Sequence, residues 1–256
     1  MTRSKIVLLA TGGTATNMVF NAVNGRFGID SVVLEDRENP VAFLRRRVRK
    51  LGISTVAGQV AFQVFVAKAL NALSQDRIRE IEKQYSLNSR DIPKEVVHRV
   101  SSVNDDATIR LLKTIGPGLV LVSGTRIISK KVIDAVGCPL INIHAGITPK
   151  YRGVHGAYWA LANDDPENCG VTVHCVDKGI DTGSVLSQQR IEITKKDNFA
   201  TYPMLQLACG IDLLCAAIEA HRENRIPAVH PPSESKLWYH PTLFQYAYYR
   251  IIKHVK

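Results

Sequence analysis

Short apolar runs alternate with longer stretches of helical periodicity through the first half of the chain. The runs share a length of four or five residues and few polar positions: 5–9, 31–34, 118–122 and 140–143. Runs that are apolar on both faces are typical of strands in a parallel sheet covered by helices on both sides. The alternation therefore predicts an α/β fold, with an open, mainly parallel, doubly wound (Rossmann-like) sheet.

Between the second and third runs lies a long helical insertion, at about residues 56–97. The stretch 53–73 is mostly apolar, and the stretch 74–86 is charged and periodic. Gln59 and Gln63 are four residues apart and share one helix face. So little polar surface indicates a largely buried helix or a contact with a partner. The insertion is a lid or a partner surface, and the sequence does not choose between them.

The second half of the chain adds two strand patterns, at 171–176 and 185–193, and a long helical pattern at 197–220. After residue 222 the prolines at 227, 231 and 232 interrupt regular structure, so we expect a catalytic domain at 1–222 and a C-terminal tail at 223–256. The stretch 236–250 of that tail is aromatic and weakly basic. We expect it to wrap the domain or to form a homodimer contact; a surface on which a nucleotide base stacks is the alternative.

Charge and composition narrow the class of protein. The 256 residues carry a net charge of +10, which suits an anionic ligand. The basic run Arg45–Lys50 reads as a solvated helix face; without interleaved aromatic residues it does not support a nucleic-acid partner. We expect no membrane span, because no run approaches about 18 apolar residues, and the start of the chain lacks a signal-peptide pattern. Five cysteines without metal-like spacing indicate reduced thiols in the cytoplasm, and no histidine pair has ligand spacing, so no metal is expected.

Candidate chemistry is concentrated after the run 140–143. Asn142 and His144 are two residues apart and therefore lie on one face of a strand. Asp181 lies at the centre of the Gly-bracketed loop 179–183. An amide, an imidazole and a carboxylate at strand ends form a set that can move protons and stabilise an oxyanion.

A second candidate lies in the turn after the first strand. Gly12, Gly13 and Thr14 precede a helix that contains Asn17, and such a small-residue turn exposes backbone N–H groups that suit an anion. The alternative is a tight strand–helix turn with no ligand. The chain has no GxGxxG motif, which argues against a dinucleotide site.

Several motifs in order resemble the folate-dependent formyltransferase family: Asn-x-His at 142–144, Pro-Lys-Tyr-x-Gly at 149–153, Gly-Val-Thr-Val-His at 170–174 and Gly-Ile-Asp-Thr-Gly at 179–183. The resemblance is dense from 118 to 190 and weaker back to residue 5. It implies 10-formyltetrahydrofolate as co-substrate and a formyl transfer to a primary amine. One departure is that the family's small-Ser-Leu-Leu-Pro run after the histidine is Ala145-Gly146-Ile147-Thr148-Pro149 here.

The resemblance also implies roles for individual residues. Asn142 would donate its amide to the oxyanion, His144 would donate a second hydrogen bond, and Asp181 would raise the pKa of His144 so that the imidazolium persists near neutral pH. Main-chain groups in two turns would hold the pterin, at Arg126, Ile127 and Ile128 and at Asp177, Lys178, Gly179 and Ile180. The substrate side would include Gly153 and, for a substrate phosphate, Gly12, Gly13, Thr14 and Asn17.

Three interpretations follow. The first is an N-formyltransferase acting on a small phosphorylated amine, either glycinamide ribonucleotide or a nucleotide-linked amino sugar. Methionyl-tRNA is disfavoured as the acceptor, because residues 222–256 are too few for the β-barrel domain of that branch. The second is a hydrolase that releases formate from the same co-substrate, disfavoured because its relatives carry an extra N-terminal domain and this chain starts at its first strand. The third is a non-catalytic folate- or nucleotide-binding module, against which the complete set of three polar residues argues.

Overall fold

A seven-stranded sheet forms the centre of the computed structural model, which describes residues 4–223, 225 and 234–256. The strand order is β3-β2-β1-β4-β5-β7-β8. Five strands are parallel: β1 (Ile6–Thr11), β2 (Ser31–Glu35), β3 (Val97–Val100), β4 (Leu119–Ser123) and β5 (Leu140–His144). Two more are antiparallel to their neighbours: β7 (Gly170–Cys175) and β8 (Val185–Arg190). This confirms the predicted mainly parallel α/β sheet.

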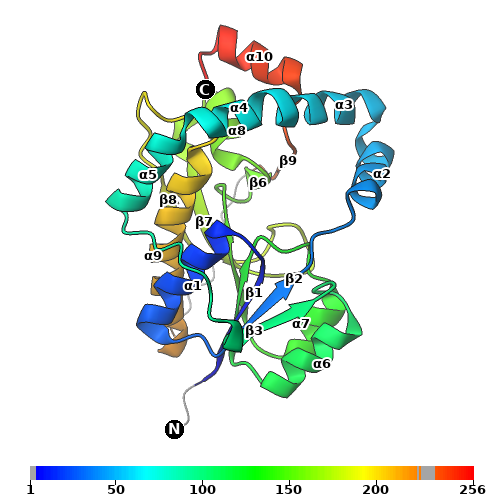
Figure 1. Ribbon diagram of the computed structural model, residues 1–256, viewed down its shortest axis with the longest axis vertical. Helices are drawn as coiled ribbons and strands as arrows, with labels where there is room; N and C mark the ends of the chain where they lie inside the picture. The colour runs from blue at the N-terminus through cyan, green and yellow to red at the C-terminus, as the bar shows by residue number, and fades with distance from the viewer. Residues whose placement is uncertain (1–3, 224, 226–233) are drawn as a thin grey trace.

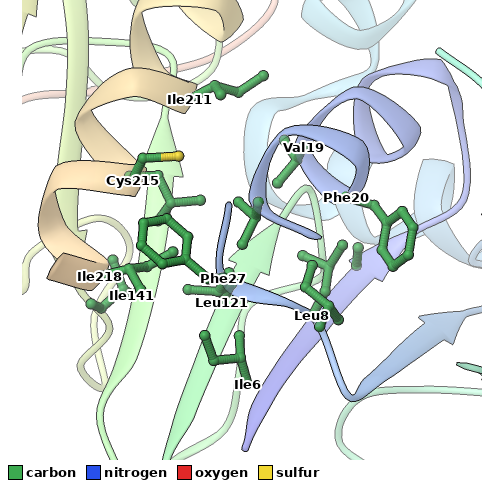
Figure 2. Packing of buried hydrophobic residues seen from close by; sticks show 14 of the residues in the cluster. Ile6, Leu8, Val19, Phe20, Phe27, Leu121, Ile141, Ile211, Cys215 and Ile218 are labelled. Carbon is green, nitrogen blue, oxygen red and sulfur yellow. The ribbon is translucent and has the colours of Figure 1, made fainter. Parts of the chain in front are cut away.

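Helices cover both faces of this sheet (Figure 1). On one face lie α1 (Thr14–Phe27) and α9 (Tyr202–Arg222), which contact each other. On the other face lie α6 (Asp106–Ile115) and α7 (Lys130–Val136). The alternation of side chains along β1 explains both layers, because Ile6 and Leu8 pack under α1 and α9 while Val7 and Leu9 pack under α6 and α7. Figure 2 shows the first of these cores, in which Phe27 of α1 lies near Cys215 and Ile218 of α9.

A third helical layer lies beyond the carboxyl ends of the parallel strands (Figure 1). It consists of α2 (Pro40–Leu51), α3 (Ile53–Ala61), the π-helical turn η1 (Phe62–Ala67), α4 (Lys68–Leu73), α5 (Gln75–Gln84), α8 (Gly156–Ala162) and α10 (Leu243–Ile252). The side chain of Asn39 caps α2 by accepting hydrogen bonds from Val41 and Ala42, as the Asn-Pro pair predicts. Four cations of the basic run, Arg45, Arg46, Arg49 and Lys50, are exposed on α2 as expected, whereas Arg47 is half-buried and donates to the side chain of Gln59.

The C-terminal segment anchors the helical insertion. Phe62 is fully buried, and its ring centroid lies 4.8 Å from that of Phe199 and 5.0 Å from that of Tyr246 on α10. Trp159 is buried as well, and it stacks on Trp238 of the short strand β9 (Leu237–Trp238), which pairs with β6 (Arg152–Gly153). The described part of the tail therefore wraps the domain, one of the expected arrangements. Pro227, Pro231 and Pro232 lie outside the described residues.

The sequence led us to expect no helix that is long and apolar enough to cross a membrane. By length and composition alone that expectation is wrong. Two helical stretches are long and apolar enough. One is Ile53–Leu73, which joins α3, η1 and α4, and the other is Tyr202–Arg222, which is α9. Of the apolar 18-residue window, 56% is buried in α9 but only 17% in Ile53–Leu73. The helix α9 is thus the core helix that packs on β5, β7 and α1, whereas Ile53–Leu73 shows most of its apolar surface to solvent.

We predict that Phe62→Ala destabilises the protein by about 3–5 kcal/mol, because it removes the ring on which the insertion and α10 meet. Phe65 lies three residues further on the same helix but is 71% exposed, so Phe65→Ala should change the free energy of unfolding by less than about 0.5 kcal/mol. Urea unfolding of both variants measures the difference. Equal losses would contradict the anchoring role of Phe62.

Candidate active site

A cleft of about 440 Å³ opens at the carboxyl ends of β4 and β5, where open α/β sheets bind ligands. It gathers most of the residues that the sequence singled out. From the predicted catalytic and substrate sets it contains Asn142, His144, Gly153 and Asp181, and from the predicted pterin turns Arg126, Ile127, Ile128, Asp177, Gly179 and Ile180. Its lining in the described chain does not include Lys178 or the turn at Gly12–Asn17.

Asp181 occupies a left-handed backbone position, with a φ of 51°, that turns its carboxylate into the cleft. One carboxylate oxygen lies 3.4 Å from Nδ1 of His144, and the other lies 3.6 Å from Nε2 of His174. The backbone N–H of Gly153 donates a hydrogen bond of 3.0 Å to the same carboxylate. The loop itself is fixed by Asp177, which accepts hydrogen bonds from the N–H of Gly179 and the hydroxyl of Thr182.

Gly153 has to be glycine for two reasons. Its φ of +95° is a conformation that other L-residues rarely adopt, and a Cβ atom here would lie 2.3 Å from the carbonyl oxygen of Trp238. The close approach of β6 and β9 at this position brings the Gly153 N–H to Asp181. The strand β9 of the aromatic tail thereby helps to position the Gly153 N–H that binds Asp181.

The protonation of this group is governed by burial. Burial alone raises the pKa of Asp181, but His144, His174 and the Gly153 N–H outweigh it and hold that pKa at about 2. Burial lowers the pKa of His144, which is 5% exposed, and Asp181 offsets only part of this effect. The expected rise in the pKa of His144 is therefore wrong in direction, since desolvation of the ring exceeds the attraction of one carboxylate.

The contacts of His144 nevertheless suit a ring that is protonated on both nitrogens. Its Nε2 lies 2.8 Å from the carbonyl oxygen of Tyr151, and its Nδ1 faces Asp181, so both ring nitrogens meet oxygen acceptors. Hydrogen-bond geometry favours the imidazolium and burial opposes it.

His174 is a site residue that the sequence analysis did not select. It lies directly opposite Asn142 in the antiparallel β5–β7 pair, and the amide nitrogen of Asn142 is 3.1 Å from its Nε2. Its Nδ1 lies 2.7 Å from the carbonyl oxygen of Cys175, and its Nε2 lies between the amide of Asn142 and the carboxylate of Asp181. The signal was present in Val-Thr-Val-His, because alternation puts Thr172 and His174 on one face, but the antiparallel register needed the structure.

Glu35 is a second residue that the sequence analysis missed. This buried carboxylate at the end of β2 accepts a hydrogen bond of 2.5 Å from the backbone N–H of Arg126 and one of 3.2 Å from Val103. The Arg126 side chain donates to the carbonyl oxygens of Asp36 and Ser101. Arg126 thus shapes the turn through contacts within the protein, and the carbonyl oxygens of Arg126 and Ile127 accept hydrogen bonds from Thr125 and Asn104.

The turn at the start of α1 lies apart from the cleft lining. Gly12, Gly13 and Thr14 are exposed, and Gly13 begins the helix without a side-chain cap. The amide of Asn17 is already engaged, since it donates to the carbonyl oxygen of Ser89 at 3.3 Å and to the carboxylate of Asp91 at 3.2 Å. An anion at this turn would therefore meet backbone N–H groups, and Asn17 would have to break these contacts to bind it.

The described residues hold no group of three or more His, Cys, Asp or Glu side chains that could bind a metal ion. The partly apolar lining of the cleft, with Val122, Ile127 and Val176 among the residues, suits a flat ring held by main-chain groups.

These features define a class of α/β protein: a doubly wound sheet with an amide, an imidazole and a carboxylate in a cleft at its switch between parallel and antiparallel strands. Residues 50–205 match the family model described as formyl transferase. The chain belongs to the formyl transferase family, whose members transfer formyl groups.

Relatives of several kinds are similar to this chain. The methionyl-tRNA formyltransferase of Thermodesulfovibrio yellowstonii is 32% identical over 142 residues, which is 55% of this chain and 45% of the relative. That of Syntrophus aciditrophicus is 33% identical over 129 residues, which is 49% of this chain and 41% of the relative. The matched regions thus span less than half the length of these relatives.

Solved structures share the fold at lower identity. A 4-N formyltransferase from Francisella tularensis superposes with a TM-score of 0.58 at 15% identity, over 92% of this chain and 76% of that one. A phosphoribosylglycinamide formyltransferase from Streptococcus pneumoniae superposes with a TM-score of 0.55 at 20% identity, over 86% of this chain and 99% of that one. At these identities the likeness concerns the fold alone.

A polar cluster next to the cleft should make the stability of the protein depend on pH. Nε2 of His155 lies 2.9 Å from Nδ1 of His240, and Gln63 and Gln59 of the insertion bond to His240 as well. Burial lowers the pKa of His155 to about 3 and that of His240 to about 4. Both rings are therefore neutral in the folded protein at neutral pH, and the nearby Arg47 reinforces this for His240.

We predict that stability falls as the pH is lowered from about 6.5 to about 4. The unfolded chain binds protons on these histidines below about pH 6.5, whereas the folded chain does so only near pH 3–4, so each histidine costs up to about 1.4 kcal/mol per pH unit in that window. Urea unfolding at several pH values measures the slope, and His240→Gln should make it shallower. An unchanged slope in the variant would contradict the assignment.

Proposed function

We propose that this protein is an N-formyltransferase that moves the formyl group of 10-formyltetrahydrofolate to the primary amine of a small phosphorylated substrate. The observation that carries the proposal is the convergence of Asn142, His144 and Asp181 in one cleft, with contacts of 3.4 Å and 3.6 Å joining Asp181 to His144 and His174. The family of the chain supports formyl transfer, and the cleft supplies the groups that this reaction needs.

The reaction forms a bond between the amine nitrogen and the formyl carbon, and it breaks the bond between that carbon and a folate nitrogen. Between the two steps the formyl oxygen carries negative charge. Asn142 has two amide protons, of which one points to His174, so the other is free to donate to the oxyanion. The folate nitrogen must leave with a proton, and the amine must lose one.

The pair of Asp181 and His144 supports this proton movement. The carboxylate of Asp181 is ionised throughout the neutral range and stabilises positive charge on the neighbouring ring. When the oxyanion forms beside it, His144 holds a second proton more readily, because opposite charges attract strongly in a buried site. His174 acts on Asn142 by accepting one of its amide protons, which orients the other.

The charge of the protein limits which amines are plausible acceptors. The net charge of +10 and the exposed Gly12–Thr14 turn favour an anionic acceptor, either glycinamide ribonucleotide or a nucleotide-linked amino sugar. The engaged amide of Asn17 weakens the phosphate site at that turn, so it argues for the amino sugar. The matched curated relatives are methionyl-tRNA formyltransferases, which makes methionyl-tRNA a third candidate acceptor.

A folate-release assay distinguishes these acceptors. We expect formyl-free tetrahydrofolate to appear when the protein is mixed with 10-formyltetrahydrofolate and one amine from a panel of glycinamide ribonucleotide, nucleotide-linked amino sugars and methionyl-tRNA. Release with one amine names the acceptor. Release without any amine would show a hydrolase, and folate binding without release would show a binding module; either result would overturn the proposal.

Replacement of the carboxylate tests the mechanism. Asp181→Asn keeps an oxygen that can accept from Gly153 but removes the charge beside His144, so we expect kcat to fall by about 100-fold or more with the melting temperature little changed. The matched control is Asp134→Asn on the exposed helix α7, which should keep full activity. Wild-type turnover in Asp181→Asn would remove this carboxylate from the mechanism.

A further inference from the structure

The helices α2 and α3 form a hairpin whose outward side is apolar. No residue of α2 is buried, and α3 buries only Val56 and Gln59. Between the two helices runs a groove of about 540 Å³ with an almost entirely apolar lining. The side chains that form this surface, which we call the hairpin face, are Leu44, Val48, Ile53, Val56, Ala57, Val60, Ala61, Val64 and Phe65.

Several large apolar side chains of the hairpin face are exposed to solvent. Ile53 is 75% exposed, Phe65 71%, Val64 54% and Val60 42%, and Leu73 at the end of the same helical stretch is 84% exposed. Single exposed apolar residues are common, but a contiguous apolar groove is typical of an interaction surface. The opposite side of the stretch is bound to the protein through Phe62. The stretch is therefore packed against the rest of the protein. It could cross a bilayer only if the contacts of Phe62 with Phe199 and Tyr246 were broken.

A row of cations borders the hairpin face. Arg45 and Arg49 are one helical turn apart on α2 and follow Leu44 and Val48 in the sequence, so they lie beside the apolar stripe. Together with Arg46 and Lys50 they line a separate shallow hollow on that helix. In the described chain the ion pairs of this row are limited to Arg46 with Glu38. The row thus keeps most of its positive charge.

We propose that the hairpin face is a docking surface for an anionic lipid membrane. The apolar side chains would enter the boundary between headgroups and acyl chains, and Arg45, Arg49 and Lys50 would meet the anionic headgroups. The charge row favours this occupant, because anionic headgroups supply the negative charge that Arg45, Arg49 and Lys50 do not meet in the ion pairs of the described chain. The surface is built from α2, α3 and η1, and it shares no lining residue with the cleft at β4 and β5.

Vesicle sedimentation tests the proposal. The full chain should sediment with vesicles of phosphatidylcholine and phosphatidylglycerol but far less with phosphatidylcholine alone, and about 0.5 M salt should weaken the binding. The double substitution Arg45→Glu and Arg49→Glu should weaken it by about tenfold or more. The matched control reverses two exposed charges on α6, Arg110→Glu and Lys113→Glu, and should bind like the original chain.

The apolar contribution has its own pair of variants. Phe65→Glu should abolish vesicle binding and Phe65→Leu should retain it, and thermal melting should show both variants folded, because Phe65 is mostly exposed. Failure of the original chain to bind anionic vesicles, or equal binding by the α2 and α6 double variants, would overturn the proposal. A dimer in light scattering that Phe65→Glu dissociates, without vesicle binding, would assign the face to a second copy instead. None of these measurements depends on formyl transfer.

Discussion

The antiparallel pairing of β5 with β7 is the constraint on which the candidate site depends. It places Asn142 opposite His174 and His144 opposite Thr172, so two strands that meet in opposite directions present three polar side chains to one cleft. The loop that follows β7 then returns Asp181 to the same point. A slip of one residue in this register would turn His174 to the other face of the sheet and leave the amide of Asn142 without this partner. The apolar residues that fix the register, such as Ile141 and Val173, are fully buried in the core under α9.

Three polar contacts around this pairing join parts of the chain that are distant in sequence. Asp181 is bound by Gly153, Arg126 by Glu35, and His240 by Gln59 of the insertion. Such contacts are expensive to leave unmade, so they fix the relative positions of the segments that they join. The site is therefore held by the sheet on one side and by the insertion and the C-terminal segment on the other.

Much of the sheet was predictable because the strands carry their signal locally. Runs such as 5–9 and 118–122 are apolar on both faces, and a buried parallel strand is the ordinary structure for them. Asn142 and His144 were predictable as neighbours for the same reason, since period two is a property of the strand itself. His174 and Glu35 were not, because their importance depends on which strands pair and on which turn lies over the end of β2, and both are long-range properties. The pKa of His144 was misjudged because a sequence shows the nearby carboxylate but not the depth of burial.

The contact between the insertion and the C-terminal segment has a consequence for how the protein is made. Gln59 is separated by 181 positions from His240, whose carbonyl oxygen accepts its hydrogen bond. At a synthesis rate of about 5–20 residues per second, the apolar insertion waits roughly 10–40 s before its anchoring residues exist. During that interval the ring of Phe62 has no α10 to pack against, and the hairpin is a long apolar segment on a nascent chain. The order of the segments along the chain thus leaves this apolar helix without its C-terminal contacts until synthesis is nearly complete.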